Sequence, residues 1–388
     1  MKKIMVILLV LCMMLAFVAC QTSQPAESPA GDAEESAQPA DSGDEAADSD
    51  EVEDGDEAAD SGEMQTLKLA SHNAVVSGNP YRIRYEADIQ EAIEDAKNYG
   101  FDISYASFVA EWDPATEQQL IENSINEGYD IILVNPVSST GIDPLIDKAV
   151  DAGIKVIFAD IPYFSEKTLN VGADQYEFGY ESATFMGETL GEGAKVILIN
   201  AIEGNIANDW REDGFNAGIE EQGLEVVGRY NHQWDATTAV NVMTEIINSG
   251  VEFDGILTSQ LAESVLTAYD TTGADLPKAI AFGDVAQYGQ KMLEINKDEE
   301  VMSYLFMSNP PGVGASALNF GLNEMMGNVI DPEVITQYDG FKMVRIPSRL
   351  SYTYETQEEY RDMIEAMAPS DAVTYWLTID EVKEEFFQ

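Results

Sequence analysis

The stretch IILVNPVSSTGIDPLIDKAVDAGIKVIFAD, residues 131–160, decides the fold class of this chain. It opens with four consecutive aliphatic residues at 131–134 and closes with a second apolar run at 156–158. Between these runs, residues 143–152 have apolar side chains at the spacing of an amphipathic helix. An apolar strand, a helix and another apolar strand are typical of a parallel sheet with helices on both faces.

The same alternation continues on both sides of this unit. We expect further strands over residues 67–70, 101–105, 196–199, 226–227, 255–257 and 279–282. We expect further helices over residues 83–99, 115–126, 176–190, 209–221, 237–248 and 262–271. Because so many strands exceed one comfortable sheet, the sequence predicts an α/β fold with two doubly wound parallel-sheet lobes.

The N-terminus has the pattern of a secretion signal. Lys2 and Lys3 precede an apolar run over residues 5–19 that is short for a membrane span, so residues 1–20 are predicted to be a signal peptide. The run ends in small residues before Cys20, which resembles the lipobox of bacterial lipoproteins and implies acylation of Cys20. The alternative is an ordinary secretory signal with an incidental cysteine. Cys12 leaves with the signal, so no internal disulfide is expected.

Residues 21–66 are predicted to be a disordered acidic linker. They hold 16 of the 71 acidic residues and no lysine or arginine, and they have almost no large apolar side chain. Such a segment cannot bury enough surface to offset the entropy of the chain. We expect it to act as a solvated tether. Outside the linker and the signal, 55 acidic and 18 basic residues remain, so the folded part is acidic in its own right.

The composition argues against several classes of function. The formal charge of -51 opposes nucleic-acid binding, which needs a basic face to displace counterions from phosphates. Two histidines and two cysteines are too few for a structural zinc site or a cysteine–histidine catalytic pair. The glycines at 187–193 lack the Gly-Lys-Ser/Thr of a phosphate loop. We therefore predict no catalytic residue, metal or cofactor, and no enzymatic activity.

In doubly wound sheets, ligands bind beyond the carboxyl ends of the strands. The residues that follow the expected strands are mainly hydrogen-bonding groups and aromatic rings: Asn79, Tyr81, Trp112, Asp113, Asn135, Asp160, Trp234, Gln260 and Asp284. Carboxylates and amides can bind adjacent hydroxyls, and an aromatic ring can cover an apolar face. A polyhydroxylated, nearly neutral ligand fits this set best.

Seven short segments follow one another in a familiar order. They are Asn79-Pro80-Tyr81, Asn135-Pro136 with Ser138-Ser139, residues 152–160, Val171-Gly172-Ala173-Asp174, residues 211–215, residues 279–284 and Asn309-Pro310-Pro311-Gly312. From residue 67 to residue 327 they resemble the ribose-binding-protein branch of the type I periplasmic sugar-binding proteins of ABC importers. The resemblance implies two Rossmann-like lobes joined by three crossovers, near Asp174, Ser308 and Phe341.

That resemblance also implies lobe boundaries and a ligand site. Residues 67–173 plus 309–341 would form the N-terminal lobe, and residues 174–308 plus 342–388 the C-terminal lobe, which the tail from 339 would brace. The implied ligand-binding residues are Tyr81, Arg82, Asn135, Asp160, Arg211, Trp234, Gln260, Asp284 and Ser308, with Asn79, Trp112 and Asp113 as secondary candidates. Ile161, Gln260-Leu261 and Ser308 differ from common family residues, so the identity of the sugar stays open.

The resemblance predicts a sugar-binding lipoprotein on the extracytoplasmic face of the cell membrane. It would bind a monosaccharide or a similar polyhydroxylated small molecule and deliver it by hinge closure to an ABC permease and its ATPase. The expected membrane contact is the lipid anchor (palmitate or a similar acyl chain) on Cys20, and the protein is expected to be a monomer. The alternative is a sensory lipoprotein that presents a sugar or an autoinducer to a chemoreceptor or histidine kinase.

Overall fold

The computed structural model describes residues 64–338 and 340–388. The expected signal peptide, the lipidated Cys20 and the linker up to residue 63 lie outside the described residues. The first strand begins at Gln65, so the linker that was expected to reach residue 66 ends slightly earlier. Within the described residues, no helix has the length and apolar character needed to cross a membrane.

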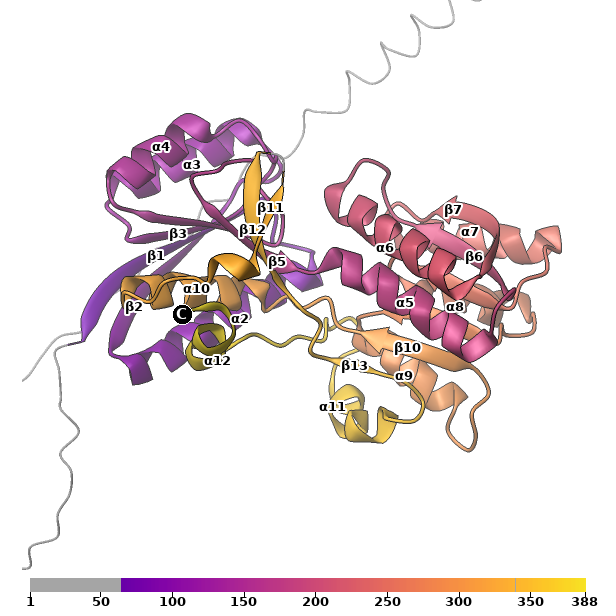
Figure 1. Cartoon of the computed structure of the whole chain (residues 1–388). Helices are drawn as coiled ribbons and strands as arrows, with labels where there is room; N and C mark the ends of the chain where they lie inside the picture. The colour runs from indigo at the N-terminus through magenta and orange to yellow at the C-terminus, as the bar shows by residue number, and fades with distance from the viewer. Residues whose placement is uncertain (1–63, 339) are drawn as a thin grey trace, which may run out of the picture. The chain divides into compact units, whose positions relative to one another are not determined.

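The first lobe is built on a seven-stranded sheet with the order β11-β12-β5-β4-β3-β1-β2 (Figure 1). Its strands are β1 (Gln65–Asn73), β2 (Phe101–Val109), β3 (Ile131–Asn135), β4 (Lys155–Ala159), β5 (Leu169–Ala173), β11 (Ile335–Tyr338) and β12 (Phe341–Ile346). All neighbours are parallel except the antiparallel pair β11 and β12.

Helices cover both faces of this sheet. Those of the lobe are α2 (Pro80–Ala96), η1 (Lys97–Tyr99), α3 (Pro114–Asn126), α4 (Asp143–Asp151), α10 (Val313–Met325), η2 (Pro332–Val334) and α12 (Ile379–Phe386). Apolar side chains of α2, α10 and α12 form one core with the sheet, and those of α3 and α4 form another on the opposite face. The five residues of β3 are therefore all buried, as its apolar sequence requires.

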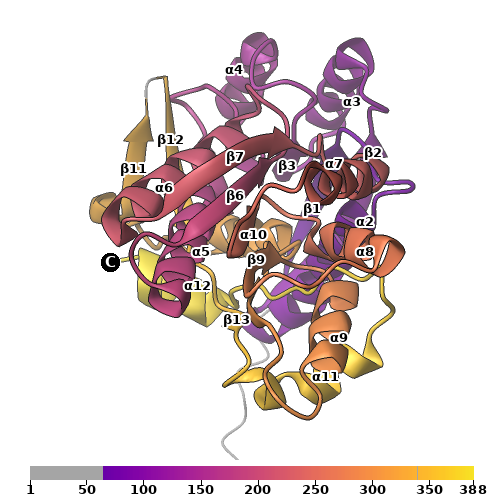
Figure 2. The same ribbon diagram turned by 90° about the vertical axis from the view of Figure 1, so that its right-hand side faces the viewer.

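The second lobe has a six-stranded sheet with the order β13-β10-β9-β8-β6-β7 (Figure 2). Its strands are β6 (Lys195–Asn200), β7 (Glu225–Asn231), β8 (Gly255–Thr258), β9 (Ala279–Gly283), β10 (Ser303–Met307) and β13 (Ser351–Tyr352). Only β13 is antiparallel to its neighbour. The helices are α5 (Gln175–Leu190), α6 (Ile206–Gln222), α7 (Ala236–Ser249), α8 (Ala262–Thr272), α9 (Ala286–Ile295), η3 (Gln357–Glu359) and α11 (Arg361–Ala366).

These two sheets confirm the predicted α/β fold with two doubly wound lobes. The strands that were expected from apolar runs are all present, and β5, β10, β11, β12 and β13 are additional to them. Helix starts follow the capping signals in the sequence, because Asn79, Asp113, Asp174 and Asp235 each accept a hydrogen bond from the backbone N–H three residues later.

The C-terminal part of the chain corrects the expected lobe boundary. Strand β12 pairs with β5 in the first sheet, so residues 342–346 belong to the N-terminal lobe and the third crossover follows at 347–350. Helix α11 packs in the second lobe through Ile364. The chain then returns, and Leu377, Val382 and Phe386 complete the core of the first lobe. The tail thus contributes to both lobes rather than to the second alone.

Candidate functional site

Backbone strain is concentrated at the carboxyl ends of the strands. Seven non-glycine residues in the described part have positive φ, between 50° and 124°: Glu111, Trp112, Asp160, Gln233, Trp234, Gln260 and Leu261. Each lies within three residues of the end of β2, β4, β7 or β8. A left-handed conformation costs such residues on the order of 1 kcal/mol or more, and it is typical of ligand-binding loops.

In the first lobe, three predicted ligand residues contact one another. Arg82, which is buried in the first turn of α2, forms an ion pair with the partly buried Asp160, which follows β4. The hydroxyl of Tyr81 lies 3.2 Å from Asp160 Oδ1 and 3.2 Å from the carbonyl oxygen of Pro310. Burial raises the pKa of Tyr81 well above its usual range, so the hydroxyl keeps its proton and donates. Arg82 Nη1 is buried without a partner in the described residues.

Asn135 is a neighbour of this group at the end of β3. Its side chain is almost fully buried, and its Nδ2 donates to the carbonyl oxygen of Ala159 at 3.3 Å. Its own carbonyl oxygen accepts from the backbone of Ala74 at 3.2 Å. Asn135, at the end of β3, therefore forms hydrogen bonds with the chain at the ends of β1 and β4, directly beside Asp160.

In the second lobe, Arg211 of α6 is fixed from several sides. Its Nε donates to Gln175 Oε1 at 2.7 Å, and its Nη1 donates to the carbonyl oxygen of Ser259 at 2.8 Å. The guanidinium also lies over the rings of Phe178 and Phe282, at 5.6 and 5.4 Å from their centroids. Burial lowers the pKa of Arg211 to about 10, which still leaves it protonated at neutral pH.

Close packing of α5 against α6 places this arginine. A Cβ atom on Gly179 would lie 2.0 Å from the carbonyl oxygen of Arg211, and one on Gly214 would lie 2.1 Å from that of Tyr176. Only glycine at both positions allows the two helix backbones to approach so closely. The glycines therefore have a direct role in positioning the guanidinium.

The arginine is linked to Asp284 through Gln260. Arg211 Nη1 donates to Gln260 Oε1 at 3.3 Å, and Gln260 Nε2 donates to Asp284 Oδ2 at 2.5 Å. Asp284 follows β9, and burial raises its pKa to about 6. Nearby Glu263, in the first turn of α8, has a pKa raised to about 7, also by burial, and its Oε2 has no partner in the described residues.

Two ring N–H groups lie beyond the end of β7. The backbone N–H of Trp234 donates to His232 Nδ1 at 3.0 Å, so a neutral His232 carries its hydrogen on Nε2. Burial lowers the pKa of His232 to about 4, which keeps the ring neutral at pH 7. Neither His232 Nε2 nor Trp234 Nε1 has a partner in the described part of the chain. Both donors therefore need a water or a ligand.

Sequence reasoning missed two residues of this kind. Asn200 ends β6 and Ser259 follows β8, and Asn200 Oδ1 and Ser259 Oγ are buried without a partner among the described residues. Their signal in the sequence was a single polar residue at the end of an apolar strand. His232 gives the same signal after β7, and its buried Nε2 also has no partner among the described residues.

Four other predicted residues are not part of these two polar groups. Asn79 and Asp113 cap α2 and α3, and hydrogen bonds from Thr116 lower the pKa of Asp113. Trp112 is exposed, with 59% of its surface accessible. Ser308 is buried, and its Oγ donates to the carbonyl oxygen of Val373 at 2.5 Å, so its hydroxyl hydrogen is already used. No group of three or more potential metal ligands occurs among the residues that the structure describes.

Comparison with known proteins identifies the family. A family model described as a periplasmic binding protein domain matches residues 74–328, which include strand ends of both sheets. The chain belongs to the periplasmic binding protein family. Within this family, it is 26% identical over 201 residues to the ribose import binding protein RbsB of Bacillus subtilis (strain 168). That match covers 51% of this chain and 64% of RbsB, so the chain matches somewhat less than two thirds of that relative's length.

Other periplasmic binding proteins match more of their own length. The D-allose-binding periplasmic protein of Escherichia coli (strain K12) is 24% identical over 266 residues, which cover 65% of this chain and 83% of that protein. A solute binding protein from Thermobispora bispora has a TM-score of 0.64 at 18% identity, over 82% of this chain and 94% of that one. One from Actinobacillus succinogenes, with bound D-allose, has a TM-score of 0.59 at 20% identity, over 76% of this chain and 100% of that one. These relatives are named as binding proteins, not as enzymes.

Proposed function

We propose that this protein is an extracytoplasmic sugar-binding lipoprotein that delivers a monosaccharide to an ABC importer. The proposal rests on two groups of polar residues, one at the strand ends of each lobe. One lobe presents Asp160 with Arg82 and Tyr81, and the other presents Arg211, Gln260 and Asp284. Unpartnered donors and acceptors lie in both lobes.

The chemistry of these groups fits a neutral polyol. Asp160 and Asp284 can accept from adjacent hydroxyls, while Arg82 and Arg211 supply fixed donors. Each carboxylate is already balanced by an arginine, directly or through Gln260, so the site has little net charge to offer an ionic ligand. The ring of Trp234 can cover the apolar C–H face of a sugar.

The relatives support the same class of ligand. The names of curated relatives mention ribose and allose, and one solved structure, from Bacillus halodurans C-125, has bound myo-inositol. All three are neutral molecules that carry several hydroxyl groups.

The mechanism that follows is hinge closure. The proposed ligand residues are divided between two lobes, and the lobes are joined by crossovers at 174–175, 308–312 and 347–350. Rotation about these crossovers would bring the two groups onto opposite sides of one sugar, as the general mechanism of this class describes. The closed form would then dock as a monomer on a permease, and no step requires catalysis or a cofactor.

The proposed location follows from the N-terminus. Acyl chains on Cys20 would hold the protein at the extracytoplasmic face of the membrane, because anchoring by lipid needs no spanning helix. The acidic linker would keep the sugar site accessible to solute above the membrane surface.

A thermal-shift screen of pentoses, hexoses, deoxysugars, polyols and nucleosides, with amino acids and inorganic anions as comparison compounds, tests the proposal. A ligand that binds only the native state raises its melting temperature. We expect a sugar or polyol to raise the melting temperature of the wild-type protein, and Arg211→Met to abolish that increase. Stabilisation by amino acids or anions alone would contradict the proposal.

A further inference from the structure

The chain passes between the two lobes a fourth time near its C-terminus. After α11 in the second lobe, residues 372–377 lead back to the first lobe, where α12 packs (Figure 1). We call residues 372–377 the strap. The sequence offered no functional account of this segment, and it lies beyond residues 74–328 that match the family model.

At the second lobe, the strap holds the backbone of a proposed ligand residue. Ala372 forms an antiparallel bridge with Val285, and the N–H of Val373 donates to the carbonyl oxygen of Asp284 at 3.1 Å. The carbonyl oxygen of Val373 accepts from Ser308 Oγ at 2.5 Å, in the second crossover. Val373 is therefore hydrogen-bonded on both sides to residues at the site and the hinge.

At the first lobe, the next residue binds the helix that carries Tyr81 and Arg82. Thr374 Oγ1 donates to Asp88 Oδ2 of α2 at 2.7 Å and accepts from the N–H of Gly312 at 2.9 Å. Asp88 is fully buried, and burial raises its pKa. A Cβ on Gly312 would lie 2.0 Å from the carbonyl oxygen of Tyr375, so the strap and the second crossover touch at backbone distance.

The end of the strap is fastened along α10. The N–H of Leu377 donates to Ser316 Oγ at 3.0 Å, and Asn319 Nδ2 donates to the carbonyl oxygen of Leu377 at 2.7 Å. One turn later, Asn323 Nδ2 donates to the carbonyl oxygen of Ile379 at 2.9 Å. These three polar residues lie on one face of α10, since they are three and four positions apart.

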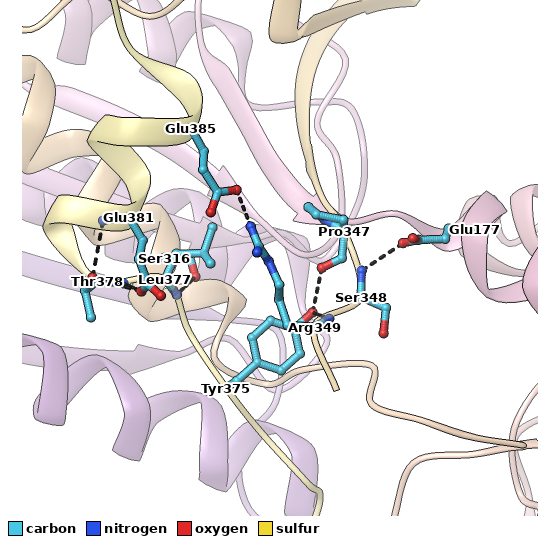
Figure 3. A network of polar contacts seen from close by, with 10 residues as sticks. All are labelled: Glu177, Ser316, Pro347, Ser348, Arg349, Tyr375, Leu377, Thr378, Glu381 and Glu385. Carbon is cyan, nitrogen blue, oxygen red and sulfur yellow. Dashed lines mark hydrogen bonds and ion pairs between the residues drawn. The ribbon is translucent and has the colours of Figure 1, made fainter. Parts of the chain in front are cut away.

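The strap also binds the third crossover. The hydroxyl of Tyr375 donates to the carbonyl oxygen of Pro347 at 2.7 Å and accepts from the N–H of Arg349 at 3.0 Å (Figure 3). The Arg349 guanidinium in turn pairs with Glu385 of α12. Two crossovers and both lobes are thus joined by one short segment.

We propose that the strap is a fourth hinge segment that limits the separation of the lobes and so tightens sugar binding. Val373 and Thr374 are positioning residues, because they link Asp284 to α2 without touching the ligand. If the open state is restricted, the hinge loses less conformational entropy when it closes. The entropic cost of binding is then smaller, so the affinity for the sugar is higher. This inference rests on the proposed function for its affinity effect, but the effect on lobe separation does not need a ligand.

The test is the distance between spin labels on the two lobes, measured without sugar. Labels at Asp151→Cys and Asp275→Cys, two exposed positions in different lobes, would be placed in the full chain carrying Cys12→Ser and Cys20→Ser. Thr374→Val removes both hydrogen bonds of the strap hydroxyl and keeps the shape. We expect longer and broader distances in this variant, whereas Thr374→Ser should match the wild type.

Two further variants complete the design. Thr353→Val makes the same change in the tail, where the Thr353 hydroxyl donates to nearby Glu355, and it should leave the distances unchanged. Tyr375→Phe removes the contact with Pro347 and carries the test if Thr374→Val does not fold. Sugar affinity in Thr374→Val should fall roughly threefold to tenfold, as expected for lost hydrogen bonds.

The outcomes distinguish the strap proposal from the proposed sugar-binding function. Distances in Thr374→Val and Tyr375→Phe that equal the wild-type distances would overturn the strap proposal even if sugar binds tightly. Altered distances with no sugar binding in any variant would support the strap and contradict the proposed function. A lower melting temperature with unchanged distances would mean that the strap only stabilises the fold.

Discussion

Gln260 donates a hydrogen bond to Asp284 at 2.5 Å while its other amide atom accepts from Arg211. One neutral side chain thus connects a buried cation to a buried carboxyl in the second lobe. Since a buried charge is costly unless it is paired or hydrogen-bonded, Gln260 keeps both groups in place before any ligand arrives. The backbone of Gln260 has a φ of 124°, which places the strain at the residue that makes this link.

Gln260→Met should weaken sugar binding by about tenfold or more. The change keeps the side-chain length but removes a donor to buried Asp284 and an acceptor for Arg211, which typically costs 1–3 kcal/mol for a buried group. Isothermal calorimetry of the variant measures the effect, with Gln118→Met on the exposed face of α3 as the matched control. Equal affinities for the two variants would show that Gln260 has no role at the site.

Sugar affinity should fall as the pH drops below about 6. The pKa of Asp284 is raised to about 6 by burial, so acid protonates the carboxylate that is proposed to accept from a hydroxyl. Below that pKa the sugar affinity can fall by nearly tenfold for each unit of pH. His232, with a pKa of about 4, does not titrate in this range. Constant affinity between pH 7 and 5 would rule out an ionised Asp284 as the acceptor.

The neighbouring Glu263 gives a second pH effect, on stability. Burial raises its folded-state pKa to about 7, so its contribution to stability is fully present below its ordinary pKa of 4.5 and is lost as the pH rises through 7. Chemical denaturation at pH 5 and pH 8 should show that wild type loses stability relative to Glu263→Gln at the higher pH. The opposite sign would mean that Glu263 is ionised and paired in the folded protein.

Asp160→Asn should abolish sugar binding and lower the free energy of unfolding by about 3 kcal/mol. The change leaves the buried guanidinium of Arg82 without its counter-charge, which is strongly destabilising for a buried pair. Asp147→Asn, which breaks the exposed pair with Lys167, is the control and should leave the free energy of unfolding nearly unchanged, because solvent screens an exposed pair. Denaturant melts would contradict the account if both variants lost the same amount.

Trp234 should report binding by fluorescence. Its Nε1 is buried without a partner in the described residues, so a sugar that contacts the ring changes its surroundings. The fluorescence change on sugar addition should disappear in Trp234→Phe. It should persist in Trp112→Phe, because Trp112 is exposed to solvent. A signal that survives in Trp234→Phe would place the ligand elsewhere.

Deletion of residues 22–63 should leave affinity for free sugar unchanged, since the segment is proposed to be only a tether. Calorimetry on the deleted and the full-length protein compares them directly. A loss of more than a few fold would indicate that the acidic segment contacts the site or the ligand.

Local patterns in the sequence predicted much of the fold. The apolar run 131–134 predicted β3. Helices α2 and α3 begin at Pro80 and Pro114, slightly before the expected starts at 83 and 115, because Asn79 and Asp113 cap them and proline suits the first helical position. Strand β5 was not foreseen because it contains Asn170. That residue is buried only because its Oδ1 accepts from the N–H of Tyr163 and its Nδ2 donates to the carbonyl oxygen of Lys342, 172 positions away.

The site was predictable only in part, because some of its contacts also join residues that are far apart in the sequence. The rule that ligands bind beyond strand ends pointed to Asp160, Gln260 and Asp284, which the structure brings into two polar groups. It could not indicate that Val373 uses the hydroxyl hydrogen of Ser308, or that the polar face of α10 binds the tail. Those contacts join segments more than 50 residues apart, and no local pattern encodes them.

Calorimetric titration of the wild-type protein, Asp160→Ala and Arg211→Ala with the sugar that gives the largest thermal shift tests the central claim most directly. One arginine–carboxylate group lies in each lobe, so the account predicts that one sugar binds per wild-type chain and that neither variant binds it, although both still unfold cooperatively. Wild-type affinity in both variants would contradict a sugar site at the strand ends.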